Sequence, residues 1–548
     1  TPLRALSRNT MSLVNICSRI FDHCQQRPNH LALCIPHMQG HKYLGEETIS
    51  YGDLAERCAL MQTALKKLSL KAGDRVLILA RPQINTYILM LALFGLGIVP
   101  VLIDRGMSRD RILAAIRASR AKVAIGEQRI LRLWWLFQPL WPLKRYAFDG
   151  KAVGVTDLSK YYPRITPELQ CELLPTNAHG LITFTSGSTG TPKGADRTHG
   201  SLIEQHLAIR AHGQDLANDI DSPCFPVVVL HNLCCGISTM MPRVDLATPA
   251  HVDGLAIIRH WHKTDVSRVS AAPAFIQAVC NAAILSKKTL SKVRSVVVGG
   301  STIPYSLVLQ LDEVFPQADI MLVYGSTEAE PIATIGLNEL RQHWNTYAGH
   351  LVGQPVEQAE VCIVNSQGLL DHELDVQQAQ VPVEEVGEIL VSGTHVLHGY
   401  VDNPQANRES KIPRSNGSVW HKTGDAGFFD KQGRLWLVGR IKDALDITGE
   451  AIYTFAAEKE LDSLPFVSRS ALIQHKQHIV LVLESTNPPH PSTLLSILNK
   501  HNIPQAKLVV IDKMPVDGRH NSKIDRVKLK TLISKNKLSL ISLVQSAA

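Results

Sequence analysis

The chain has 548 residues, 45% of them hydrophobic and 19% charged, which is typical of a globular protein with two or more domains and excludes a disordered chain. The 57 Lys and Arg against 49 Asp and Glu leave a net charge of +8, a mild surplus compatible with anionic ligands or a membrane surface. Nucleic-acid binders usually concentrate positive charge in one patch, so this surplus predicts no nucleic-acid partner. The 10 Cys are scattered without C-x-x-C spacing, which favours a reducing, cytoplasmic compartment.

The first 170 residues alternate between helical and strand-like segments. Helical spacing is found in residues 51–68, 87–94 and 109–120, and short apolar runs occupy residues 75–80 and 99–103. Short apolar runs separated by helices are typical of a parallel sheet covered on both faces. This part of the chain therefore predicts an α/β fold.

Two segments raise the question of a membrane. Residues 87–103 carry no charge, but a spanning helix needs about 20 apolar residues, and Gly and Pro near the end favour a buried helix followed by a buried strand. Residues 129–145 combine three Trp with four basic residues, which could anchor the protein at a lipid interface. The interpretation we favour there is a helix that packs its Trp face on the domain. The first 30 residues contain no apolar stretch long enough for a signal peptide.

The alternation continues towards residue 330 and then changes character. Strand-like runs are predicted at residues 227–230, 269–270, 295–298 and 321–323, each followed by a helical or turn segment. Residues 388–392 and 434–438, separated by Gly, Asn and Asp, indicate a more antiparallel region. A compact mixed pattern restarts after residue 440. We therefore predict a large α/β domain with a β-rich subdomain at residues 1–440 and a small, mobile α+β domain at residues 441–548.

The strongest chemical signal is the ten-residue run TSGSTGTPKG at positions 185–194, which follows an apolar stretch. Glycines allow successive backbone N–H groups to face one anion, the hydroxyls add donors, and Lys193 supplies a mobile positive charge. This composition suits a polyphosphate. The run is not a Walker loop, because Pro192 precedes the lysine where that motif has glycine.

This loop resembles the phosphate loop of the adenylate-forming superfamily, which includes acyl-CoA synthetases, peptide-synthetase adenylation domains and luciferases. Further motifs of that superfamily follow in the same order and together span most of the chain. The string VGGS at residues 298–301 resembles its adenine-facing turn, and YGSTE at residues 324–328 resembles the next one. GEI-x-x-x-G at residues 387–393 and TGD at residues 423–425 come next.

The last two motifs resemble the hinge and the terminal lysine motif of the same superfamily. GRIKD at residues 439–443 resembles the hinge, with Lys442 at the pivot position, and KIDR at residues 523–526 resembles the terminal motif, preceded by Ser522 instead of Gly. The resemblance implies that ATP and a carboxylic acid form an acyl-adenylate in a cleft between the two domains. Lys523 would neutralise the charge that builds up when a carboxylate attacks an α-phosphate.

The resemblance also implies roles for the other motif residues. Tyr324 would stack on adenine, Thr327 would bind phosphate or the substrate carboxylate, Glu328 would hold Mg²⁺, and Asp425 would accept the ribose hydroxyls. Lys193, Thr327, Glu328 and Lys523 are the implied catalytic residues. The residues expected around the nucleotide are Thr185, Ser186, Gly187, Ser188, Thr189, Gly190, Thr191, Lys193, Gly299, Gly300, Ser301, Tyr324, Gly325, Ser326, Thr327, Asp425 and Arg440.

Several positions depart from the common pattern. Thr454 and Ala456 replace the usual Pro and Glu at the start of the small domain, and His231 and Gly236 are five residues apart where the superfamily usually shows F-H-x-x-G. Amino-acid-activating relatives place an Asp near this point, whereas this chain has His231 and Asn232. We therefore expect a fatty acid and not an amino acid as the substrate.

Within the superfamily, three strings resemble the olefin-pathway β-lactone synthetases: Tyr453-Thr454, residues 519–524 and the region of Phe225-Pro226. The expected function is activation of a hydrophobic, β-hydroxylated acid with release of pyrophosphate, followed by closure of a β-lactone. The alternatives are transfer of the acyl group to CoA or to a carrier-protein thiol, and an inactive adenylate-binding relative. An α/β-hydrolase is excluded as a third class, because no G-x-S-x-G occurs.

Overall fold

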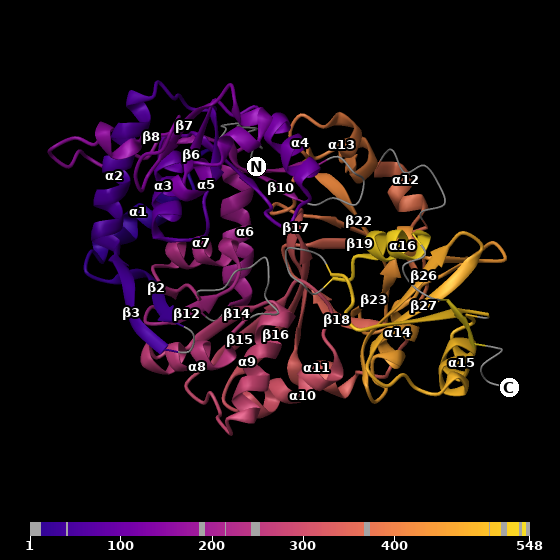
Figure 1. The fold of residues 1–548 in the computed structure, drawn as a ribbon. Coiled ribbons are helices and arrows are strands. Elements are labelled where there is room, and N and C mark those ends of the chain that lie inside the picture. Colours follow the sequence, from indigo (N-terminus) through magenta and orange to yellow (C-terminus); the bar gives the residue numbers. More distant parts are fainter. Residues whose placement is uncertain are drawn as a thin grey trace, which may run out of the picture.

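The computed structural model describes residues 12–39, 42–185, 192–213, 215–242, 252–365, 373–503, 505–516, 523–535 and 540–543. Figure 1 shows the fold, coloured along the sequence. Two large sheets and their covering helices occupy the indigo-to-orange part of the chain, and a smaller α+β unit follows in yellow. This arrangement confirms the predicted fold class.

The first sheet has seven strands and is parallel apart from one edge. Its strands, in spatial order, are β11 (Lys193–Thr198), β10 (His179–Thr185), β5 (Val99–Ile103), β4 (Arg75–Leu79), β6 (Val123–Gly126), β7 (Lys144–Ala147) and β8 (Thr156–Asp157). The antiparallel edge is the β10–β11 hairpin, in which Thr185 pairs with Lys193.

Among the helices around this sheet, those at residues 51–67, 84–95 and 109–119 match predicted helices, whereas those at residues 17–26 and 199–212 were not predicted. These helices are α1 (Cys17–Gln26), α2 (Tyr51–Lys67), α3 (Ile84–Gly95), α4 (Arg109–Ser119) and α6 (His199–His212). The uncharged segment at residues 87–103 forms the end of α3 and then β5, with almost every side chain buried. No helix in the described part of the chain has the length and apolar character required to cross a bilayer.

The second sheet has fourteen strands and joins a parallel part to an antiparallel part. Its order is β19 (Glu360–Val364), β20 (Gly387–Ser392), β22 (Val419–Phe429), β23 (Leu435–Arg440), β18 (His350–Pro355), β17 (Ala329–Gly336), β16 (Asp319–Ser326), β15 (Ser295–Gly299), β14 (Arg268–Ala271), β12 (Ile220–Pro223), β13 (Ser238–Met240), β2 (Leu31–Gln39) and β3 (Lys42–Ser50), with β21 (Lys411–Pro413) paired to β22. Neighbours from β2 to β16 are parallel, and the pairs outside that range are antiparallel. The antiparallel part is the predicted β-rich region.

The helices of this second half are α7 (Pro226–Cys235), α8 (Gly254–Lys263), α9 (Pro273–Leu285), α10 (Tyr305–Val314), α11 (Leu337–Gln342), α12 (Glu373–Gln378) and α13 (Pro404–Ser410). One prediction is wrong here: residues 227–230 are not a strand but belong to α7. Pro226 occupies the first turn, where a missing N–H costs nothing, and Gly236 ends the helix at φ 71°. A short apolar run cannot be distinguished from a buried helix by periodicity alone.

The Trp-rich segment at residues 129–145 also differs from the prediction. It forms one short helical turn, α5 (Gln128–Leu131), followed by two 3₁₀ turns at Trp134–Leu136 and Gln138–Leu140. Pro139 lacks the N–H that a continuing α-helix requires. Trp134 packs partly on the domain, whereas Trp135 and Trp141 are exposed, so no helix with a buried Trp face exists here.

Residues after 440 build the yellow unit of Figure 1. Its four-stranded sheet has the order β26 (Val467–His475), β27 (His478–Ser485), β28 (Lys507–Ile511) and β29 (Ile541–Ser542), accompanied by the hairpin β24 (Leu445–Ile447)–β25 (Glu450–Ile452). Its helices are α14 (Phe455–Leu461), α15 (Pro491–Lys500) and α16 (Arg526–Ser534). Two hydrophobic clusters consist of residues from 445 to 543 alone, so this unit has a core of its own.

Candidate active site

The VGGS motif at residues 298–301 and the YGSTE motif at residues 324–328 lie at the same edge of the fourteen-stranded sheet, which we call the large sheet. β15 and β16 are parallel and in register from Ser295–Asp319 to Gly299–Val323. Gly300 and Ser301 therefore follow one strand where Tyr324 and Gly325 occur on the next. Gly300 has a backbone φ of 102°, which residues other than glycine rarely adopt. Carboxyl ends of adjacent parallel strands are the usual place for a nucleotide in such sheets.

Tyr324, Asp425 and Arg440 meet at this edge although they come from three strands. The Tyr324 hydroxyl donates to Oδ2 of Asp425 at 2.7 Å, and Nε of Arg440 lies 3.1 Å from Oδ1 of the same carboxylate. Arg440 also donates to the carbonyl oxygen of Thr423 at 3.1 Å. Pairing of β22 with β23 sets Asp425 opposite Arg440. The structure thus brings together three of the residues expected at the nucleotide.

Thr327 and Glu328 form the turn between β16 and β17. Arg197 donates to the carbonyl oxygen of Thr327 at 3.3 Å, and the N–H of Glu328 donates to Oγ of Ser326 at 3.3 Å. Oε1 of Glu328 accepts a hydrogen bond of 2.7 Å from the hydroxyl of Tyr400. The turn is therefore held from both sides, and it positions the carboxylate expected to bind Mg²⁺.

The electrostatic surroundings keep Glu328 ionised. Burial by itself raises the pKa of this carboxyl, but His421, the Tyr400 hydrogen bond and the Lys411 ammonium outweigh it and lower the pKa to about 2. Burial lowers the pKa of His421 to about 3, so that ring is neutral near pH 7 and Tyr400 and Lys411 are the effective partners there. Burial also lowers the pKa of Lys411 to about 7, although Glu328 opposes this shift.

Lys193 lies beside the same group of residues. It begins β11 directly opposite Thr185, and its ammonium lies 5.2 Å from the centre of the Tyr400 ring. A Cβ on the neighbouring Gly194 would approach the side chains of Phe184 and Val401 to 2.9 Å, so a larger residue there would force these side chains to shift. The expected phosphate-binding residues Ser186, Gly187, Ser188, Thr189, Gly190 and Thr191 lie outside the described residues. Lys193 and Glu328 are thus gathered around Tyr400.

Lys442 and Lys523 occupy different surroundings. Lys442 belongs to a 3₁₀ turn, Ile441–Asp443, that follows β23. Burial lowers the pKa of Lys442; Asp443 opposes this shift, and the positive charges of Arg440, Lys530 and Lys193 add to it. The residue predicted as a pivot is therefore close enough to Lys193 to feel its charge. Lys523 is exposed on the C-terminal unit, a few residues before α16.

The terminal KIDR motif contacts the predicted hinge through its arginine. Arg526 donates to both carboxylate oxygens of Glu458 at 2.7 and 2.8 Å and to the carbonyl oxygen of Leu472 at 2.6 Å. Its Nε lies 3.8 Å from Asp443. Lys459 of α14 contacts the segment before β18, with its ammonium 2.9 Å from the carbonyl oxygen of Gly349 and 4.3 Å from the centre of the Trp344 ring.

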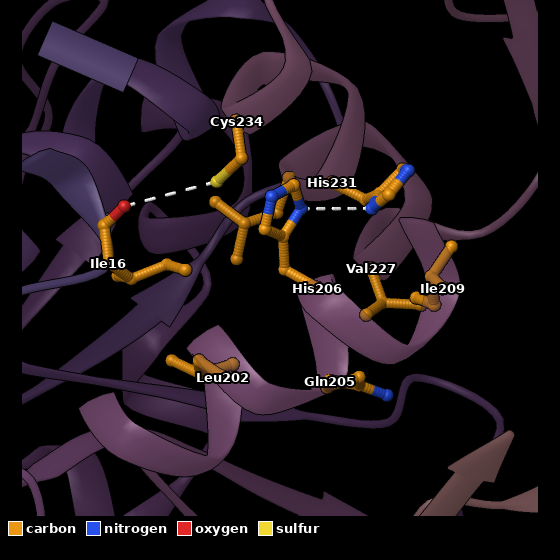
Figure 2. A pocket seen from close by; sticks show the side chains of 9 residues that line it. Ile16, Leu202, Gln205, His206, Ile209, Val227, His231 and Cys234 are labelled. Carbon is orange, nitrogen blue, oxygen red and sulfur yellow. Dashed lines mark hydrogen bonds between the residues drawn. The ribbon is translucent and has the colours of Figure 1, made fainter. Parts of the chain in front are cut away.

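A small pocket lies between α6 and α7 (Figure 2). Its lining is apolar apart from a few polar side chains and consists of Ile16, Leu202, Gln205, His206, Ile209, Val227, Leu230, His231 and Cys234. Nδ1 of His206 lies 3.0 Å from Nδ1 of His231, the contact drawn as a dashed line in Figure 2. Burial and the neighbouring His231 lower the pKa of His206 to about 3. His206 therefore carries no charge at physiological pH, and the lining on its side of the pocket is neutral.

Acidic residues lie nearer to His231 and Asn232 than the sequence suggested. Asp221 accepts from Nδ2 of Asn232 at 2.9 Å, and Oδ2 of Asp215 is 3.3 Å from Nε2 of His231. The expectation that no acid is placed there is wrong, because strand β12, which carries Asp221, packs against α7, and Asp215 in the segment before that strand reaches His231. Asp215 is, however, ion-paired to Arg268, and burial raises the pKa of Asp221. Neither carboxylate lines the pocket.

Sequence reasoning missed Tyr400, Lys411 and His206. Tyr400 donates a hydrogen bond to Glu328, and the charge of Lys411 lowers the pKa of the same carboxyl. These two residues follow Glu328 by 72 and 83 positions in the chain, so no local pattern reveals the contacts. A Gly-Tyr pair shortly after the GEI-x-x-x-G string was the available signal for Tyr400. His206 is one of 23 His in the chain, and only its position opposite His231 distinguishes it.

The chain belongs to the AMP-binding enzyme family, whose model matches residues 20–401, and it is an adenylate-forming ligase. It is 30% identical to an olefin β-lactone synthetase of Stenotrophomonas maltophilia (strain K279a) over 94% of this chain and 97% of that protein. It is 22% identical to 4-coumarate–CoA ligase 1 of Petroselinum crispum over 78% of this chain and 77% of that one. The O-succinylbenzoate coenzyme A synthetase of Bacillus subtilis in complex with AMP has a similar fold, with a TM-score of 0.75, 20% identity and coverage of 95% and 98%.

Proposed function

We propose that this enzyme activates a hydrophobic carboxylic acid with ATP, releasing pyrophosphate and forming an acyl-adenylate. The observation that carries the proposal is the convergence of Tyr324, Asp425 and Arg440, which lie on the fourteen-stranded sheet, with Glu328 in the turn after β16 and with Lys193, which shares Tyr400 with Glu328. In the reaction, a carboxylate oxygen of the acid forms a bond to the α-phosphorus, and the bond from that phosphorus to the pyrophosphate oxygen breaks. Lys193 would attract the polyphosphate, and Asp425 would accept hydrogen bonds from the ribose hydroxyls.

The donor set at Glu328 fits a magnesium ion. A hard divalent cation prefers ionised oxygen ligands, and the pKa of Glu328, lowered to about 2, keeps this carboxylate ionised. Tyr400 engages Oε1 and so orients the group. A bound magnesium ion would supply charge neutralisation for the leaving pyrophosphate. Thr327, adjacent in the turn, would contact phosphate or the substrate carboxylate.

We further propose residues 1–440 and 441–548 as the two domains, with Lys442 as the hinge pivot. The separate hydrophobic clusters of residues 445–543 support this division. Lys523, on the smaller domain, would reach both the carboxylate and the α-phosphate once the cleft closes. The ten cysteines are all free, which supports a cytoplasmic setting.

For the second step we propose attack of the acid's own β-hydroxyl on the activated carbonyl, with AMP leaving and a β-lactone closing. The 30% identity to an olefin β-lactone synthetase across nearly the whole chain supports this choice. A hydroxyl held in the same molecule can correspond to an effective concentration of about 10⁵ M or more. Transfer to the thiol of CoA or of a carrier protein is the second candidate, supported by the resemblance to 4-coumarate–CoA ligase 1. Retention of Lys523 and Glu328 argues against an inactive relative.

The character of the pocket leads to a prediction about substrates. We expect medium- and long-chain fatty acids to support acid-dependent ATP–pyrophosphate exchange and free amino acids to give none. The lining in Figure 2 is mainly apolar and contains no carboxylate, since Asp215 is paired with Arg268 and Asp221 lies outside the lining, so an ammonium group in this pocket would lack a counter-ion. Exchange with amino acids but not with fatty acids would contradict the assignment.

The second step is tested by product analysis. The purified enzyme is supplied with ATP, Mg²⁺ and a 3-hydroxy fatty acid without CoA, and the products are analysed by mass spectrometry. We expect a compound lighter than the acid by one water, together with AMP and pyrophosphate. The same acid without its hydroxyl serves as the matched control and should give no such compound. A thioester that appears only after CoA is added, with no lactone, would establish the ligase instead.

A further inference from the structure

The exposed Trp-rich segment is the most unusual part of the surface. Among the large apolar side chains in this region, the exposed fractions are 58% for Trp135, 57% for Trp141, 42% for Leu133 and 39% for Leu136. Nε1 of Trp141 donates to the carbonyl oxygen of Trp135 at 3.2 Å, so the two indoles are neighbours. We call these four residues, together with Val153, the Trp patch.

Val153 extends the patch from the loop before β8. It is 91% exposed, and its carbonyl oxygen accepts from Nε1 of Trp134 at 3.0 Å, which fixes this loop beside the Trp turns. Trp134 is partly buried, and the guanidinium of Arg145 stacks on its ring at 3.9 Å from the ring centre. Arg145 also donates to the carbonyl oxygens of Leu140, Trp141 and Gly154, so the turns are rigidly tied together. The apolar side chains are thus held outward by a fixed backbone.

The stretch of chain that carries the patch is strongly basic, although Arg120, Lys122 and Arg129 in it are ion-paired with Asp402, Asp74 and Glu127. Residues 105–154 contain eleven Lys and Arg and three Asp and Glu, a surplus of eight that equals the net charge of the whole chain. The remainder of the protein carries no net charge.

Hydrogen bonds attach part of this charge directly to the Trp turns. From α4, Arg109 donates to the carbonyl oxygen of Leu136 at 3.0 Å and Arg117 donates to Oε1 of Gln138 at 3.1 Å. Both acceptors are neutral, so these contacts leave the guanidinium charges uncompensated. Arg132 and Lys144 are exposed within the same segment. An apolar centre is thus bordered by cationic side chains.

The patch is remote from the candidate active site within the first sheet. The Trp turns connect β6 to β7, whereas Lys193 lies on the β10–β11 hairpin, and β5, β4 and β6 separate β7 from β10. A surface bound at the patch would therefore leave the nucleotide edge open. This separation allows binding and chemistry to be tested independently.

We propose that the Trp patch docks the enzyme on an anionic phospholipid surface. Indole rings favour the headgroup layer, aliphatic side chains enter the acyl boundary, and Arg and Lys attract anionic lipids. A single-stranded nucleic acid would also be attracted by the charge and could stack on the indoles. The exposed Leu133, Leu136 and Val153 favour lipid, because aliphatic side chains offer no stacking face for bases. Docking of this kind needs no membrane-spanning helix.

The test measures binding of the full-length protein to vesicles. Cosedimentation is compared for phosphatidylcholine vesicles with and without a third of phosphatidylglycerol, at low and high salt. We expect binding only to the anionic vesicles and weakening by salt. Trp135→Ala/Trp141→Ala should lower the partition coefficient about tenfold or more, because two interfacial anchors are lost. Quenching of tryptophan fluorescence by brominated lipids should occur in the wild type and fall in this variant.

Matched controls keep the outcome specific. Leu285→Ala/Leu309→Ala removes two exposed apolar side chains elsewhere and should bind vesicles as the wild type does. Circular dichroism and pyrophosphate exchange with a water-soluble acid should be unchanged in both double variants. Equal vesicle binding by the wild type and the Trp variant would overturn the proposal. So would binding of a labelled oligonucleotide without vesicle binding, or a Trp-dependent dimer in ultracentrifugation that does not bind vesicles.

Discussion

Lys523→Ala is expected to reduce acyl-adenylate formation by about 10² to 10³ while the protein remains folded, since loss of one preorganised charge contact in a transition state typically has that effect. Two anions must approach each other when a carboxylate attacks an α-phosphate, and an ammonium group that reaches both lowers this repulsion. Lys523 is exposed, so its truncation creates no cavity. The measurement is ATP–pyrophosphate exchange with a saturating fatty acid, together with thermal unfolding.

Lys528→Ala is the control for this experiment. Lys528 is an exposed lysine of α16, five residues beyond Lys523, and it lies outside the residues assigned to the site. The control should retain exchange, which separates a local catalytic effect from a general effect of positive charge on the small domain. Exchange close to the wild-type rate in Lys523→Ala would remove this lysine from the mechanism.

Glu328→Gln is expected to lower pyrophosphate exchange by about 10², because an anionic oxygen ligand for magnesium is replaced by a neutral amide. Tyr400→Phe keeps the carboxylate charge but removes its hydrogen bond, and should have a smaller effect that higher magnesium concentrations partly restore. The magnesium dependence of exchange is measured for both variants. Glu313→Gln, at an exposed carboxylate of α10, is the matched control and should be unaffected.

Thermal unfolding provides an independent test of the charge on Glu328. The folded-state pKa of Glu328, about 2, is lower than the ordinary value, so its ionised form stabilises the fold at neutral pH. This contribution is fully present above the ordinary pKa of 4.5 and is lost progressively as the pH falls from there through the folded pKa, so part of it is already lost at pH 3. Glu328→Gln should therefore lower the Tm more at pH 7 than at pH 3. Identical Tm differences at the two pH values would show that Lys411 and Tyr400 do not stabilise the ionised carboxylate.

Much of the fold was predictable because the relevant signals are local. The helical spacing of residues 51–68 and the apolar run at 75–80 became α2 and β4 almost to the residue. The prediction of a strand at residues 227–230 is wrong, because a run of four buried apolar residues has the same pattern in a helix as in a strand. The Trp segment was misjudged for a related reason: exposure depends on what packs above a residue, and prolines broke the helix that would have buried the rings.

The sequence by itself determined the class of enzyme and most of the candidate site, since the phosphate loop, the YGSTE turn, the TGD turn and the hinge are contiguous strings whose residue types suit a nucleotide. Only the tertiary structure decided which distant residues complete that site. Tyr400 meets Glu328, and Asp425 meets both Tyr324 and Arg440, because strand pairing brings together positions far apart in the chain. It also decided that Asp215 and Asp221 lie beneath His231 and Asn232, and that two indoles face solvent. Contacts, burial and the resulting pKa shifts depend on the packing of separate segments, which no local string encodes.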